Sequence, residues 1–229
     1  MTLRRISVIL ALLGIAVLPW LLTTGYWRGI LVLCAMNVLL ALSLNLVMGY
    51  TGQLNLGQSA FFAIGAYVST ILVKSHGWNF WPAALAAILA SGLVGLALAA
   101  FATRLKGHYL AIASLGVNAA VWKAFAFGLG AAIAGLAGVF YPGFVGTLVP
   151  DAFGIIESFT MMAMVIVGGM GTMIGPVIGA VVLTFLPELL RGFGELRLMI
   201  YGLALTLVVL FMPGGIVQAY TSLRARRRP

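Results

Sequence analysis

Residues 30–48 read ILVLCAMNVLLALSLNLVM, and residues 49–59 continue as GYTGQLNLGQS. The first stretch is apolar, carries no charge, and has the length that an α-helix needs to cross the hydrocarbon core of a bilayer, about 20 residues. The second stretch gathers amides, hydroxyls and glycines directly at the end of that helix. Together they predict a transmembrane helix followed by a polar break, which indicates a membrane-embedded helical fold.

Seven further apolar runs along the chain fit the same length criterion. A stretch of about eleven residues, 108–118, is too short to cross a bilayer by itself. The first run follows Arg4 and Arg5 but lacks a convincing cleavage site, so we expect an uncleaved span. The eight expected spans are 6–23, 30–48, 54–73, 82–103, 124–141, 155–170, 173–190 and 198–212.

Composition supports this class of protein. Hydrophobic residues make up 63% of the 229 residues and charged residues only 7%, whereas soluble domains carry roughly 25% charged residues. We therefore expect an all-α, polytopic transmembrane bundle of about eight spans that forms one domain over residues 1–229.

The basic residues predict the orientation. If eight spans alternate from an internal N-terminus, nine of the thirteen Lys and Arg residues lie inside and four outside, as the positive-inside rule requires. Both termini, including the basic tail 218–229, are then cytoplasmic. Because the bases lie at the ends of apolar runs, the net charge of +9 does not indicate nucleic-acid binding. The internal bases are Arg4, Arg5, Arg104, Lys106, Lys123, Arg224, Arg226, Arg227 and Arg228, and the external ones are Arg28, Lys74, Arg191 and Arg197.

The sequence lacks the residue patterns that several kinds of chemistry require. Cys34, His76 and His108 do not have metal-ligand spacing, so we expect no metal and no cofactor. The sequence contains no phosphate-binding G-x-x-x-x-G-K-[ST] motif and no G-x-S-x-G or H-E-x-x-H motif. No ionisable residue lies well inside a predicted span, which argues against a proton-coupled transporter or channel. We expect a protein that is not an enzyme and that depends on another subunit if its transport is active.

Small residues recur at four-residue spacing, a pattern that lets membrane helices approach closely. The joint between the spans 155–170 and 173–190 is too tight for an ordinary loop, so we expect short, tilted or re-entrant helices there. Its packing residues are Gly168, Gly169, Gly171, Thr172, Gly175 and Gly179. The three stripes are Ala87, Ser91, Gly95 and Ala99; Ala126, Gly130, Ala134 and Gly138; and Gly171, Gly175 and Gly179.

The polar break permits two interpretations. Its amides and hydroxyls could line a substrate path at a broken helix end. They could instead cap helices and form interhelical hydrogen bonds, as we also expect for Asn37. The candidates for the path are Asn45, Gln53, Asn55, Gln58 and Ser59.

Long motifs in this chain resemble the branched-chain amino-acid ABC transporter permeases. The resemblance is carried by NLVMGYTGQLNLGQSAFFAIGAY at residues 45–67 and by RLKGHYLAIA at residues 104–113, which is similar to the M-type subunit. GLAG at residues 135–138 and VGGMGTMIGP at residues 167–176 extend it, so that it covers residues 30–216.

This resemblance implies a permease domain that spans a bacterial inner membrane several times. The implied partners are a second permease subunit, two cytoplasmic ATP-binding subunits and a periplasmic substrate-binding protein. The implied substrates are leucine, isoleucine and valine, or related small amino acids and amides such as urea. In this family the binding protein largely sets specificity, and ATP hydrolysis by the partners drives transport.

The chain departs from the family pattern after Gly116. Members of the family continue there through two spans and a charged cytoplasmic loop that docks on the ATPase, whereas here residues 117–123 follow directly. An internal deletion near residues 116–117 preserves the alternation of spans. It leaves Trp122 and Lys123 as a remnant of the ATPase contact. The alternative function is therefore a non-transporting assembly partner, or a truncated remnant without ATPase coupling.

Overall fold

The computed structural model describes residues 25–104, 119–194, 196–211 and 214–217. All regular structure in these residues is helical, as predicted. The long helices are α2 (Gly25–Asn45), α3 (Gln58–His76), α4 (Phe80–Arg104), α6 (Ala119–Val145), α7 (Ile155–Gly168), α8 (Ile174–Leu189) and α9 (Leu196–Phe211). The short ones are the π-helical turn η1 (Leu46–Tyr50) and the 3₁₀ turns η2 (Pro150–Phe153) and η3 (Leu190–Phe193).

Five helical stretches within the described residues are long and apolar enough to cross a membrane, which makes the chain a multi-pass membrane protein. The predicted span 6–23, the segment 108–118, the junction at 116–117 and the tail 218–229 lie outside the described residues. The predicted spans 54–73 and 198–212 fall on described helices that are not among the five stretches, so the count of eight spans stays a prediction. The five stretches are Gly25–Tyr50, Phe80–Phe101, Val121–Val145, Pro150–Gly168 and Ile174–Phe193.

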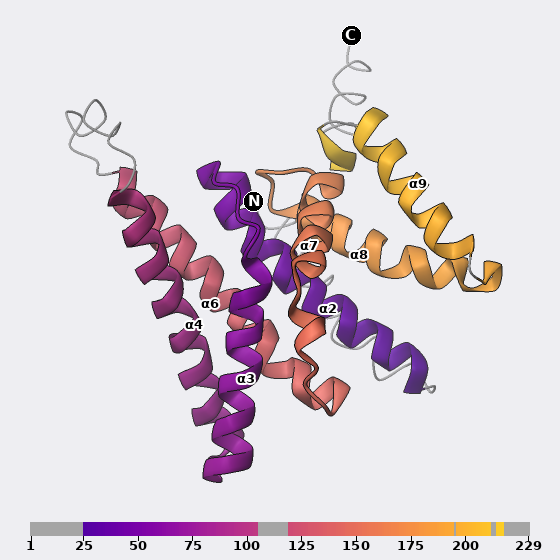
Figure 1. Cartoon of the computed structure of the whole chain (residues 1–229). Helices are drawn as coiled ribbons and strands as arrows, with labels where there is room; N and C mark the ends of the chain where they lie inside the picture. Colours follow the sequence, from indigo (N-terminus) through magenta and orange to yellow (C-terminus); the bar gives the residue numbers. More distant parts are fainter. Residues whose placement is uncertain (1–24, 105–118, 195, 212–213, 218–229) are drawn as a thin grey trace, which may run out of the picture.

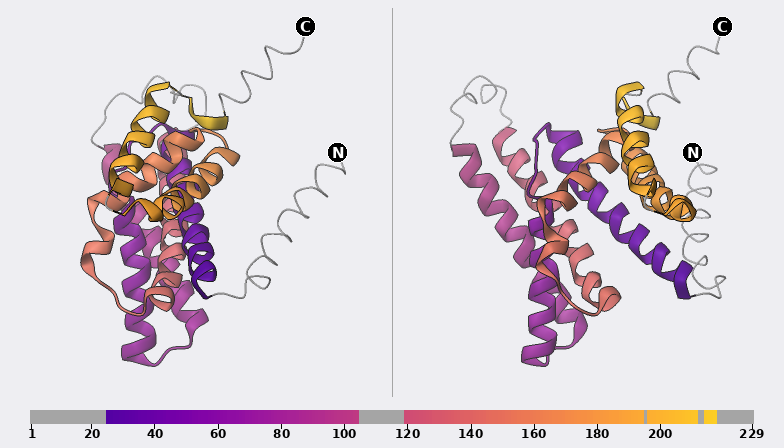
Figure 2. Two further views of the ribbon diagram at one scale, coloured as in Figure 1. Left: turned by 90° about the vertical axis from the view of Figure 1, so that its right-hand side faces the viewer. Right: turned by 45° about the vertical axis from the view of Figure 1, so that its right-hand side comes forward.

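Consecutive helices alternate in direction (Figure 1): α2, α4, α7 and α9 run one way, and α3, α6 and α8 run back. Two groups of helices result, because α3, α4 and α6 pack on one another while α7 and α8 pack on α2. Helix α6 joins the groups, since it also contacts α2, and Figure 2 shows the groups diverging from each other.

Two predicted boundaries are wrong for the same physical reason. The span expected from residue 54 begins only at Gln58, because residues 52–57 are not helical. The spans expected to meet at residues 170–173 end at Gly168 and begin at Ile174. Gly52 at the first boundary has a φ angle of 67°, and Gly169 and Gly171 at the second have φ angles of 118° and 75°, in a region that L-residues with side chains rarely adopt. Hydropathy does not register such backbone turns.

Glycines and small residues bring the helices of the first group into backbone contact. A Cβ atom at Gly65 in α3 would overlap the backbone of Gly135 in α6. The stripe on α4 is buried against the same helix, where a Cβ atom at Gly95 would overlap the side chain of Ala131. Lipid offers little hydrophobic drive for helix association, so this close approach supplies van der Waals contact instead.

We expect Gly138→Ala to destabilise the bundle by about 1–3 kcal/mol, the usual cost of overpacking. The added methyl group would overlap the Phe62 carbonyl and crowd the Ala66 amide of α3, and neither backbone group can swing aside. Denaturant-induced unfolding in mixed micelles measures the change. The control in the same helix is Gly143→Ala, where nothing lies within 4 Å of the new methyl group. Equal stability of the two variants would contradict the prediction.

Candidate functional site

The break after α2 lies within the bundle. The last turn of α2 widens into the π-helical η1, and the chain then runs back along the bundle before α3 begins (Figure 2). Backbone without helical hydrogen bonds survives at such depth only where protein or water covers it. The polar side chains of this segment are therefore expected to form hydrogen bonds that stabilise the irregular backbone, and their contacts test this.

Gln58, the first residue of α3, is fully buried and lies at the centre of one hydrogen-bond network. Its Nε2 atom donates to the Ser43 hydroxyl of α2 at 2.7 Å and to the Gly130 carbonyl of α6 at 3.5 Å. Its Oε1 atom accepts from Asn55 Nδ2 at 2.6 Å. A single amide thus links the start of α3 to both helices and to the irregular segment.

A second contact ties the start of α3 to α7. The Ser59 amide donates to the Ser158 hydroxyl at 3.1 Å, and that hydroxyl donates to the Ser59 hydroxyl at 2.8 Å. Both side chains are buried. One of the backbone N–H groups that a helix start leaves without a helical partner is satisfied in this way.

Asn45 connects the other helix break to α2. Its Oδ1 atom accepts the Gly171 amide at 3.0 Å, and its Nδ2 atom donates to the Thr172 carbonyl at 2.9 Å. A Cβ atom at Gly49 would overlap both Asn45 Oδ1 and the Gly171 backbone, so only glycine fits between them. The π-helical turn and the α7–α8 joint therefore lie in direct contact.

The joint itself is closed by Thr172 and by close packing. The Thr172 hydroxyl donates to the Gly169 carbonyl at 3.0 Å and accepts the Gly175 amide at 3.0 Å. Cβ atoms at Gly168 and Gly179 would overlap the backbone of the opposite helix, as α7 and α8 cross. The predicted stripe was wrong in one member, because Gly171 lies in the turn, exposed, where its φ angle requires glycine.

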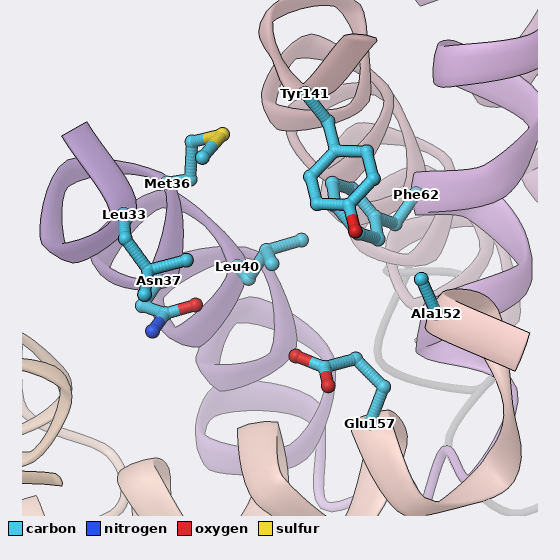
Figure 3. A pocket seen from close by; sticks show the side chains of 8 residues that line it. All are labelled: Leu33, Met36, Asn37, Leu40, Phe62, Tyr141, Ala152 and Glu157. Atoms are coloured by element: carbon cyan, nitrogen blue, oxygen red, sulfur yellow. The ribbon is translucent and has the colours of Figure 1, made fainter. Parts of the chain in front are cut away.

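A pocket of about 160 Å³ opens between α2, α3, α6 and α7. The carboxylate of Glu157 and the hydroxyl of Tyr141 point into the same space beside Leu40 (Figure 3). Phe62, Tyr141 and Phe153 form an aromatic cluster, with ring centroids 5.1–5.4 Å apart, that supports one wall. The lining residues are Leu33, Met36, Asn37, Leu40, Phe62, Tyr141, Ala152 and Glu157.

Residues 26–122 and 111–212 match the family described as branched-chain amino acid transport system, permease component. The chain belongs to this family. Among its relatives are the proteins called high-affinity branched-chain amino acid transport system permease protein LivM from Salmonella typhimurium and Escherichia coli K12, each 24% identical, with 94% of this chain and 76% of the relative covered. No solved structure matches the chain.

The alignment with these relatives is longer than the chain. It extends over 322 residues, whereas the chain has 229. Within the aligned region, the relatives therefore contain residues that have no counterpart in this permease. The two family matches overlap at residues 111–122, a stretch that contains the predicted junction at residues 116–117.

The structure gives the predicted path residues of the permease different surroundings. Asn45, Asn55, Gln58 and Ser59 are buried and hydrogen-bonded within the bundle. Gln53 is half-buried in the irregular segment. None of the five lines the pocket. Their contacts favour interhelical hydrogen bonding, and a role in lining the path stays a prediction.

Two pocket residues escaped the sequence analysis. Glu157 lies near the edge of its predicted span and was not among the candidate residues, and the structure places it half-buried in the first turn of α7. Tyr141 ended another predicted span and carried no polar neighbour in sequence. The position of an acidic residue inside an apolar run was the one signal available.

The remaining predicted residues lie at the start of α6. Trp122 is 64% exposed and packs edge-on against Phe125, which is also exposed. Lys123 is half-buried. The Trp122 indole is exposed at the helix end that is assigned to the cytoplasm, where it is accessible to a partner. The contact of Trp122 and Lys123 with an ATPase stays a prediction. Among the described residues no group of three or more His, Cys, Asp or Glu side chains could hold a metal ion.

We expect Asn45→Ala to loosen the α7–α8 joint, because the Gly171 amide loses its acceptor. Loss of a hydrogen bond worth about 1–1.5 kcal/mol lowers the free energy of local opening by that amount, so amide exchange at Gly171 becomes roughly tenfold faster. Hydrogen–deuterium exchange in detergent checks this. Asn37→Ala is the control, since its amide donates to Thr184 in the middle of α8, away from the joint. Unchanged protection of Gly171 in the Asn45 variant would show that the amide does not hold the joint.

Proposed function

We propose that this permease is the membrane-spanning subunit of an ABC importer for branched-chain amino acids or related small amino acids and amides. The observation that carries the proposal is the family match over residues 26–122 and 111–212, which includes nearly every described helix. The name of the LivM relatives refers to the same transport system. Those relatives are named as permease proteins, and the described part of this chain contains five helical stretches that are long and apolar enough to cross a membrane.

The energy for import has to come from other subunits. The sequence lacks a phosphate-binding loop, so ATP is bound and hydrolysed by partners. In the proposed complex this chain pairs with a second permease, two cytoplasmic ATP-binding subunits and a periplasmic binding protein in a bacterial inner membrane. The surplus of basic residues at the ends assigned to the cytoplasm supports this orientation.

The two helix breaks support an alternating-access transporter. Discontinuous helices are the common way for transporters to place backbone groups near a substrate path. In this permease the breaks at residues 52–57 and 169–173 are tied to α2 by the side chains of Gln58 and Asn45. We infer that these residues, with Gln53, Asn55 and Ser59, border the path and keep its broken backbone satisfied.

A second candidate function follows from the shortened chain. The relatives contain aligned residues that are missing here, and the sequence departs from the family pattern at Gly116. A chain without the docking loop would be a non-transporting assembly partner or a remnant without ATPase coupling. Association with an ATPase separates the two functions.

We expect the chain to co-purify with its ATP-binding subunit and, with all partners in proteoliposomes, to support leucine uptake that requires ATP. The physical reason is that hydrolysis on the partner has to move the helices of this chain. Radiolabelled leucine uptake measures it, with a non-hydrolysable ATP analogue as the control. Absence of a bound ATPase subunit would refute the importer and leave the assembly partner or remnant.

We also expect Trp122→Ala to weaken ATPase binding about tenfold, because a tryptophan that becomes buried on binding contributes a large share of the interface energy. Quantitative pull-down from membranes provides the measurement. The control is Trp81→Ala, because Trp81 is 76% exposed but lies in the first turn of α4, which packs near the last turns of α6 rather than near its start. Equal binding by both variants would place the ATPase contact elsewhere.

A further inference from the structure

The pocket beside Glu157 has the chemistry of a binding site. A carboxylate at membrane depth is costly unless it is paired or serves a function. Within the described residues no basic side chain lines this pocket. Another carboxylate, that of Glu188 at the end of α8, is paired with Arg191 at 3.5 Å. Glu157 thus presents a negative charge to a space that can admit a ligand.

The walls of the pocket divide into a polar and an apolar part. Glu157 and the Tyr141 hydroxyl enter it from α7 and α6 (Figure 3), which places an anionic acceptor near a neutral one. The facing wall, from α2, consists of Leu33, Met36 and Leu40 together with Asn37, whose amide donates to Thr184. Phe62 of α3 lies beside Tyr141 and adds a further apolar surface. Such a pocket suits a small molecule with a cationic head and a short aliphatic body.

The pocket lies in the half of the bundle assigned to the outside. It is lined by the first turn of α7, by η2 and by the last turns of α6, which lie at the end where α2 begins (Figure 1). A ligand arriving from the external side would therefore meet the carboxylate before it reached the two helix breaks. The pocket is separate from the Asn45 and Gln58 networks.

We propose that this pocket binds small aliphatic ammonium compounds, with the Glu157 carboxylate paired to the ammonium group and the apolar side chains of Leu33, Met36, Leu40 and Phe62 against the aliphatic chain. The identity of the physiological ligand as an amino acid rests on the proposed function, whereas the pocket does not. Charge-assisted hydrogen bonds are the strong contacts in such a site, so the ammonium group is the feature that is recognised. Neutral and anionic compounds of the same carbon skeleton are excluded.

Direct binding to the full chain in lipid nanodiscs tests the proposal. The probe is 3-methylbutylamine, followed by saturation-transfer NMR, and 4-methylpentanoate is the anionic comparison with the same branched skeleton. The wild-type chain binds the amine and not the acid. Glu157→Gln weakens amine binding by roughly tenfold or more, because the ion pair is lost.

Two further variants keep the test specific. Glu188→Gln removes a carboxylate outside the pocket and leaves amine affinity within about twofold. Ala152→Phe fills the pocket from η2 without changing its charge and abolishes binding. Thermal melting of each variant identifies any that fail to fold. Equal amine binding by Glu157→Gln, binding of the acid as tight as that of the amine, or no amine binding by the wild type would each overturn the proposal.

The importer proposal and the pocket proposal can be refuted independently of each other. The nanodisc measurement needs neither an ATPase nor a binding protein, whereas leucine uptake needs both. Amine binding without ATP-dependent uptake would refute the importer and leave the pocket standing. Uptake without amine binding to the chain would refute the pocket and leave the importer.

Discussion

Every backbone polar group at membrane depth needs a partner inside the protein, and this requirement governs the structure. Continuous helices meet it by themselves, but this permease interrupts its helices twice within the bundle. The interruptions are satisfied by two buried amides, Gln58 and Asn45, each of which bonds to chain segments far away in sequence. The fold is therefore a set of apolar helices fixed in register by a few polar side chains.

Close helix packing complements these polar contacts. The face of α6 toward α3 and α4 consists of residues such as Gly135 and Gly138, and backbone meets backbone there. The α7–α8 crossing repeats the arrangement through Gly168 and Gly179. Since lipid tails are as apolar as the side chains, shape rather than hydrophobicity decides which helix faces meet.

Hydropathy, charge placement and motif resemblance were enough to predict the helical class, the family and most helices. The same signals misplaced the ends at residues 54 and 170–173, because glycine turns and a π-helical turn have no hydropathy signature. The sequence indicated that Asn45 and Gln58 were important polar residues but not which residues they contact. The pocket around Glu157 was not predicted, since it is formed by side chains from four α-helices and η2 that the sequence cannot place together.

The pairing of Asn45 has a consequence for biogenesis. Its two partners in the α7–α8 joint lie 126 and 127 residues further along the chain. At a synthesis rate of about 5–20 residues per second, the ribosome reaches them roughly 6–25 s after it has made Asn45. During that interval α2 carries an amide whose final acceptor and donor do not yet exist. The inner end of α2 is thus completed only late in translation, when the carboxyl-terminal helices enter the bilayer.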